Sequence, residues 1–263
     1  MHRVFAMSTP VAMNIAVAAY AIAGLGVLLA LAAAVVIWNR GAPGTARVVA
    51  ALVIGSAVLA APLVLWLGQD RLPAINDLST DTQNPPPIVA LAKMRGFGAN
   101  TPAYPGERFA RAQAEAYPDL RPITIERSAE EAFEVAADAL RRLKMKIHRE
   151  DAPAGATPGI IEAVDRTLIL GFPDDVVLRV SGDTRQARID IRSASCYGRH
   201  DFGRNAERMR RIMREINGRL EATVPTASGE RVRLKSRTER AVPKREKGKV
   251  LDPKARPKGQ DPA

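Results

Sequence analysis

Two neighbouring stretches in which apolar and polar residues alternate limit the fold of this chain more than any other feature. Their apolar positions are Val176, Leu178, Val180, Ala187, Ile189 and Ile191. The residues between them, 181–184, read S-G-D-T, which is a turn composition. Because successive side chains of a strand point to opposite faces of a sheet, each stretch has one apolar and one polar face. The pattern predicts a β-hairpin within residues 172–205, followed by a Gly-rich loop that opens a helix.

Patterns on both sides of the hairpin predict an α+β domain over residues 72–224. Ser128 followed by Glu131 is a capping box, and apolar residues then recur at helical spacing up to Leu140. A second apolar stripe predicts a helix over 205–220. The other expected elements are a short helix at 107–116 and strands near 123–126, 144–149, 159–164 and 168–172. We expect a mainly antiparallel sheet covered on one face by the two longer helices, with residues 72–87 as an ordered loop.

The N-terminal part, residues 1–71, contains two uncharged apolar runs, Val11–Trp38 and Val48–Leu67. About 20 apolar residues are enough to cross a bilayer, so the runs predict a transmembrane hairpin with spans about 11–38 and 48–67. The alternative, a cleaved signal peptide, fits less well because the first run exceeds a signal core of about 7–15 residues. Arg40 and Arg47 favour a cytoplasmic loop. The soluble domain is then periplasmic, on a multi-pass protein of the bacterial inner (plasma) membrane.

The net charge of +11 is distributed unevenly along the chain. Residues 225–263 hold 12 basic and 5 acidic residues, whereas residues 72–224 hold 23 and 22. The basic segment has five prolines and few apolar residues, so we expect a disordered basic tail that can touch anionic lipid. Since the folded domain is nearly neutral, nucleic acid is not favoured as a partner. A single cysteine and three scattered histidines predict no metal site, and no cofactor motif is present.

Polar residues on the hairpin and before the N-P-P-P run are the candidates for a polar groove. They are Asn76, Asp77, Thr80, Asp81, Asp174, Asp175, Arg179, Arg192, Ser193, Ser195, Asp201 and Asn205. The groove forms if the loop at 76–81 docks on the hairpin, and it would hold a small ligand or a substrate.

Several of these candidates also have a structural interpretation. Asp174 and Asp175 are adjacent in a strand, so they point to opposite faces and cannot act together on one bond; one of them is expected to cap a bend and the other to pair with an arginine. Arg179, Asp190 and Arg192 share a face and predict a charge ladder. Ser193 and Ser195 lack a nucleophile elbow.

The loop after the hairpin allows two further alternatives. Cys196, near Arg192 and Arg199, is either an activated thiol or simply buried, and burial is the commoner case. Asp201 and Gly203 either cap the last helix or belong to an anion site at its N-terminus, and the cap is favoured.

Three runs together resemble an uncharacterised family, domain of unknown function (DUF) family 1499. They are N-D-L-S-T-D at 76–81, A-Y-P-D-L at 116–120, and F-P-D-D-V through R-S-A-S to D-F-G-R-N, ending at Asn205. The resemblance covers about residues 72–220. It implies a compact domain, often preceded by membrane spans, with no established activity. In this family an arginine usually follows R-S-x-S, and Cys196 stands there instead.

These observations support three functional hypotheses. The first is a membrane-anchored cell-envelope domain that is a non-enzymatic binding or scaffolding module for an envelope protein or a small ligand. The second is an enzyme of unknown reaction that uses the polar groove near the hairpin. The third is binding of anionic lipid or nucleic acid through the basic tail.

Overall fold

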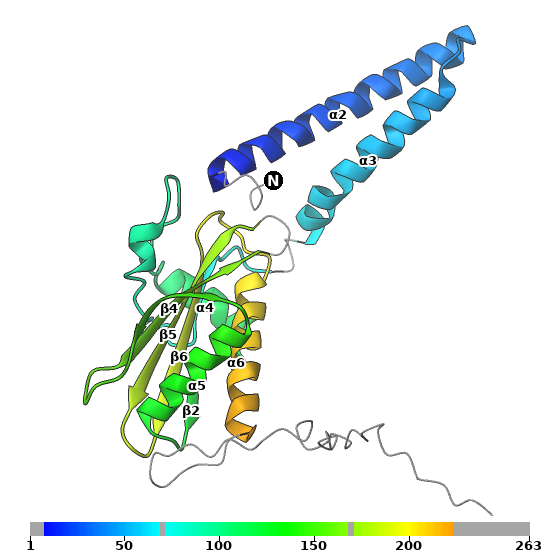
Figure 1. Ribbon diagram of the computed structural model, residues 1–263. Coiled ribbons are helices and arrows are strands. Elements are labelled where there is room, and N and C mark those ends of the chain that lie inside the picture. The colour runs from blue at the N-terminus through cyan, green and yellow to red at the C-terminus, as the bar shows by residue number, and fades with distance from the viewer. Residues whose placement is uncertain (1–7, 69–71, 168–170, 223–263) are drawn as a thin grey trace, which may run out of the picture.

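The computed structural model describes residues 8–68, 72–167 and 171–222. The chain begins with two helices, α2 (Thr9–Arg40) and α3 (Thr45–Gly68), which pack against each other and extend away from the sheet (Figure 1). Gly55 allows the close approach, because a Cβ there would lie 2.5 Å from the Cγ2 of Val27. The predicted basic tail, 225–263, lies outside the described residues.

Helix α2 is long and apolar enough to cross a membrane. Within the described residues it is the one helix that meets both criteria, since the apolar segment of α3 is the shorter Thr45–Ala60. This helix agrees with the coarser prediction from the sequence, which is that an apolar N-terminal helix anchors the chain in a membrane. The finer prediction of a two-span hairpin is not confirmed and stays a prediction.

The domain is built on a six-stranded antiparallel sheet with the order β1-β6-β5-β4-β3, in which β2 also pairs with β6. The strands are β1 (Asp77–Ser79), β2 (Ile123–Ile125), β3 (Lys146–Asp151), β4 (Gly159–Arg166), β5 (Pro173–Gly182) and β6 (Ala187–Ser195). The predicted hairpin is the pair β5–β6, with Val180 opposite Ile189. Of the strand predicted at 168–172, residues 168–170 lie outside the described residues.

Strand β1 lies inside the segment that the sequence predicts to be a loop. Its residues carry no alternating pattern, but they pair with β6, so that Asp77 is opposite Ala194. Pairing with a long neighbouring strand therefore outweighs the local propensity. On α4 (Glu107–Ala116), the side chain of Gln113 accepts a hydrogen bond from Ser79 N at 3.0 Å and donates one to Ser79 O at 2.7 Å. These bonds satisfy backbone groups that would otherwise be free at the sheet edge.

Helices α5 (Ala129–Arg142) and α6 (Arg204–Ala222) cover one face of the sheet, as predicted (Figure 1). The predicted cap of α5 is present, because Ser128 Oγ accepts a hydrogen bond from Glu131 N at 3.2 Å. The main core lies between these helices and the apolar face of the hairpin. Its fully buried members include Leu140, Leu178, Ile189, Ile191, Met209 and Ile212.

The opposite face is also covered, which the sequence analysis did not predict. A segment that we call the strap, residues 82–106, crosses this face and includes the short helix η2 (Leu91–Met94). Ile88 and Leu91 of the strap form a second small core with Val177 and Ala194. These apolar contacts help to hold an irregular segment against the otherwise polar face of β5 and β6.

Candidate functional site

The polar candidates divide between the two faces of the sheet because of strand alternation. Asp174, Ser193 and Ser195 point toward α6, whereas Asp175, Arg179 and Arg192 point toward the strap side. The prediction that Asp174 and Asp175 face opposite ways is therefore confirmed. Both carboxylates form ion pairs with arginines, whereas the sequence predicted such a pair for one of them and a bend cap for the other.

The cluster on the helix side is organised around Arg208, whose side chain is 3% exposed. Its guanidinium donates hydrogen bonds to Asp174, to Asn205 Oδ1 at 2.6 Å and to Ser193 Oγ at 3.1 Å. It also donates to Asp165 Oδ2 at 2.7 Å. These bonds tie the first turns of α6 to β4, β5 and β6.

Asn205 extends this cluster to the segment before β1. Its side-chain amide donates to Ser195 Oγ and to Asn76 O, both at 3.0 Å. Ser193 Oγ in turn donates to Asn205 Oδ1 at 2.8 Å. The two candidate nucleophiles, Ser193 and Ser195, are thus engaged in buried hydrogen bonds that hold α6 on the sheet.

Asp201 caps α6, as the favoured interpretation predicts. Its carboxylate accepts hydrogen bonds from Gly203 N at 2.8 Å and from Asn205 N at 2.9 Å. Gly203 has a φ of 77°, a left-handed conformation that glycine adopts without strain. An anion at this helix N-terminus would have to compete with Asp201 for these two N–H groups.

The cluster on the strap side contains a buried ion pair between Arg192 and Asp77. Arg192 Nε donates to Asp77 Oδ1 at 3.0 Å and Nη2 to Oδ2 at 2.7 Å, and the side chains are 3% and 6% exposed. The same guanidinium donates to the carbonyls of Pro86 at 3.0 Å and Pro102 at 2.8 Å. Arg192 therefore joins β6, β1 and both ends of the strap.

Tyr104 packs beside this pair, with the Arg192 guanidinium 5.6 Å from the centre of its ring. Burial, with a smaller effect from the charge of Asp77, raises the pKa of Tyr104 to about 12. Tyr104 thus stays protonated at neutral pH, and its apolar ring shields the ion pair from water.

Glu162 of β4 is a further residue of this face, and sequence reasoning missed it. Its side chain is fully buried and accepts hydrogen bonds from the backbone N–H groups of Val89, Ala90 and Leu91 at 2.9–3.1 Å. Arg149 Nη1 donates a fourth bond at 3.1 Å. A lone acidic residue in an otherwise apolar run of β4, G-I-I-E-A-V, is the signal that could have marked it.

Asp175 and Cys196 lie beside Arg95, near the middle of the strap. Arg95 Nε donates to Asp175 Oδ2 at 2.9 Å, and Cys196 Sγ donates to Asp175 Oδ1 at 3.3 Å. Burial, together with the negative charge of Asp175, raises the pKa of the Cys196 thiol above its ordinary value. The structure therefore favours the buried-thiol interpretation of Cys196 over an activated thiolate.

The predicted charge ladder is present in a modified form. Arg179 Nη2 donates to Asp190 Oδ2 at 2.7 Å and to Asp81 Oδ2 at 3.0 Å. Arg188 donates to the same two carboxylates, at 2.9 and 3.1 Å. The inclusion of Arg192 in this ladder was wrong, because Arg192 bonds to Asp77. Thr80 Oγ1 accepts a bond from Ile191 N at 2.9 Å, so segment 76–81 lies directly on β6.

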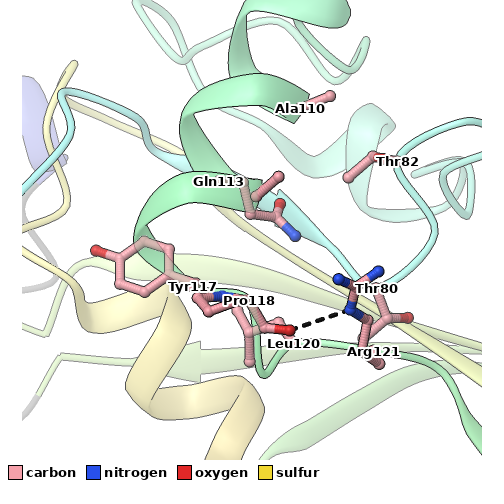
Figure 2. Close-up of a pocket in the computed structure, with 9 residues that line it drawn as sticks. Thr80, Thr82, Ala110, Gln113, Tyr117, Pro118, Leu120 and Arg121 are labelled. Carbon is pink, nitrogen blue, oxygen red and sulfur yellow. Dashed lines mark hydrogen bonds between the residues drawn. The ribbon is translucent and has the colours of Figure 1, made fainter.

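Two hollows open on the surface of the described domain. The first, of about 60 Å³, lies between α4 and Thr80–Thr82, with Gln113 and Tyr117 among its lining residues (Figure 2). Ligand pockets usually measure about 300–1,000 Å³, so this hollow has room for water rather than for a metabolite. The second, of about 480 Å³, lies between α5 and β3, and Glu130, Glu134, Glu150 and Arg141 line it beside Phe133.

A family model described as "Protein of unknown function (DUF1499)" matches residues 77–216. The chain belongs to this family. The match confirms the resemblance inferred from the three sequence runs. No curated protein and no solved structure matches the chain. The DUF1499 segment begins at β1 and ends within α6, so it contains the strap, both polar clusters and all the candidate residues except Asn76.

Proposed function

We propose that this DUF1499 protein is a membrane-anchored module of the cell envelope, whose folded domain binds or scaffolds a partner and catalyses no reaction. The observation that carries this proposal is the engagement of the polar candidates in the fold. Asp77, Asp174, Asp175 and Asp190 are buried and each is paired with an arginine. A carboxylate held in this way is stabilised as part of the fold and is poorly placed to exchange protons with a substrate.

Anchoring rests on the composition of α2 and α3. Their exposed side chains are mostly apolar, and α2 is long and apolar enough to cross a bilayer. Partner binding is supported by the hollow between α5 and β3, which is lined by three glutamates and one arginine. Its size and acidic lining suit a basic or apolar side chain of another protein.

Replacing Ser193 by alanine tests the structural role against the enzymatic alternative. Asn205 and Arg208 would lose a buried partner, so the free energy of unfolding of the full chain should fall by about 1–3 kcal/mol. Urea unfolding in detergent micelles, followed by circular dichroism, measures the change. A catalytic nucleophile behaves differently, because active-site residues are commonly neutral or unfavourable for stability.

Ser181→Ala is the matched control, because Ser181 lies at the half-exposed end of the same strand, β5. We expect this variant to unfold within about 0.5 kcal/mol of the parent chain. Equal or greater stability of Ser193→Ala relative to the parent would count against the structural role and favour the enzyme.

The topology can be checked with a reporter enzyme that is active only after export, fused after Leu72. If α2 and α3 both span the membrane and Arg40 and Arg47 hold their loop in the cytoplasm, this fusion should be active. A second fusion after Arg40 should be inactive. Activity of the second fusion but not of the first would reverse the topology and remove the periplasmic assignment.

A further inference from the structure

The folded domain exposes a few large apolar side chains within the part of the chain that the structure describes. Outside α2 and α3 they are Val89, Met94, Phe97 and Phe202. Phe97 is 96% exposed, so almost its whole ring is in contact with solvent. A single exposed apolar residue needs no explanation, but a group of them on one surface marks an interaction site. Met94 ends η2 and Phe97 lies in the loop that follows it, whereas Phe202 lies in the loop before α6.

Hydrogen bonds hold these two loops together. Asn100 N donates to Cys196 O at 2.7 Å, and Asn100 Nδ2 donates to the carbonyls of Ser195 and Gly198, both at 2.9 Å. A Cβ placed on Gly96 would lie 3.0 Å from the hydroxyl of Tyr197. Residues 94–98 and 197–203 therefore form one continuous surface, which we call the rim.

The rim lies where the apolar helices join the domain. A Cβ on Gly98 would lie 3.8 Å from Cγ of Pro10, near the start of α2. A Cβ on Gly203 would lie 3.2 Å from Leu72 Cδ1, and His200 Nε2 is 3.3 Å from Leu72 O. Leu72 follows the end of α3 by four residues. Figure 1 shows this end of the sheet facing the helix pair.

We propose that the rim is a lipid-binding surface, through which the domain inserts Phe97, Met94 and Phe202 into the interfacial layer of the bilayer that anchors it. This inference rests on the proposed membrane anchoring. If α2 and α3 cross the bilayer, the start of α2 and the end of α3 lie at its surface, and the rim lies beside them. Lipid would already be in contact with the rim at this place, so a partner protein could bind there only by displacing that lipid.

The chemistry of the rim suits the border between headgroups and acyl chains. Aromatic and other large apolar side chains enter this layer, and basic side chains beside them attract anionic headgroups. Lys93, Arg199 and Arg204 are exposed on or next to the rim. The strap meets the loop that leads into α6 here, so lipid contact would involve both segments.

The test places an environment-sensitive dye on cysteines introduced one at a time into the full chain. The variants are Phe97→Cys on the rim, Ala156→Cys in the exposed loop between β3 and β4, and Leu25→Cys in α2. The unsubstituted chain is the labelling blank, because Cys196 is buried. Each protein is reconstituted into vesicles of phosphatidylethanolamine and phosphatidylglycerol that carry nitroxide lipids, either near the headgroup or at the bilayer centre.

Quenching of the dye at position 97 by the shallow nitroxide should exceed quenching at position 156 several-fold. Leu25→Cys should respond to the deep nitroxide, which shows that α2 is inserted. Quenching at 97 no stronger than at 156, with α2 inserted, would overturn the lipid-binding rim and leave the anchoring intact. Failure at Leu25 would instead overturn the proposed anchoring. An unquenched but blue-shifted dye at 97, with chemically cross-linked dimers, would assign the rim to a second copy of the chain.

Discussion

Replacing Arg192 by methionine should lower the free energy of unfolding of the full chain by about 3–5 kcal/mol. The variant leaves the carboxylate of Asp77 buried without its cation, and the carbonyls of Pro86 and Pro102 without their donor. Arg192 also binds both ends of the strap, so the strap should open before the rest of the domain unfolds. The readout is urea unfolding in micelles, together with the rate at which a thiol reagent labels Cys196.

Arg188→Met provides the control for Arg192→Met. Arg188 pairs with Asp81 and Asp190 on the same face of the sheet, but its side chain is 47% exposed. Exposed ion pairs contribute about 0–1 kcal/mol, so this variant should remain close to the parent. Replacing both members of the buried pair, Asp77→Leu with Arg192→Met, should restore part of the loss, because no unpaired charge remains. Equal effects of the Arg192 and Arg188 variants would contradict the structural role of the buried pair.

The elements that could be predicted from the sequence are those specified by local patterns. Alternation in β5 and β6 gave the hairpin and the opposite orientations of Asp174 and Asp175. The capping box at Ser128 marked the start of α5, and Asp201 was recognised as a cap of α6. In each case the signal lies within a few residues of the structure that it specifies.

The strap could not be predicted, because contacts between distant residues hold it. Arg192 and Asp77 are 115 positions apart, and Glu162 lies 71–73 positions from the three N–H groups that it accepts. Residues 82–106 carry no periodicity that indicates a surface for packing, and they contribute Ile88 and Leu91 to a small core, with Ala92 packed against it. The same limit applies to Arg208, which appears in the sequence as one of several arginines along a helix face and in the structure as the centre of a buried cluster.

The candidate site shows why polar residues near a hairpin are ambiguous in a sequence. Arginine and aspartate are the residues of a catalytic groove, and they are also the residues that satisfy an irregular backbone covering a sheet. The two roles differ in how deeply the charged side chains are buried and in which groups they bind. Both properties depend here on the strap. The DUF1499 match spans both clusters, so the strap and the arginines that bind it lie within the same family segment.

Glu162→Ala is the variant that most directly tests how buried charged residues hold the strap on the sheet. It removes the acceptor for the N–H groups of Val89, Ala90 and Leu91, and each of these three buried donors left unsatisfied costs about 1–3 kcal/mol. Part of this loss is recovered if the strap moves to let water in, so we expect a net loss of about 3–5 kcal/mol. Hydrogen exchange should show the amides of these three residues losing protection, while amides in the centre of β5 and β6 keep theirs.

Two matched variants separate the loss of the acceptor from the loss of charge. Glu162→Gln keeps one carbonyl oxygen but introduces an NH₂ group facing backbone donors, so its loss should be intermediate. Glu150→Ala removes a carboxylate from neighbouring β3 that pairs with Arg141 at a partly exposed position, and should change stability by about 1 kcal/mol or less. If Glu162→Ala were no more harmful than Glu150→Ala, with unchanged exchange at the strap, the strap would be held by Ile88, Leu91 and the arginines alone. The hydrogen bonds from the strap to Glu162 would then contribute little to the stability of the domain.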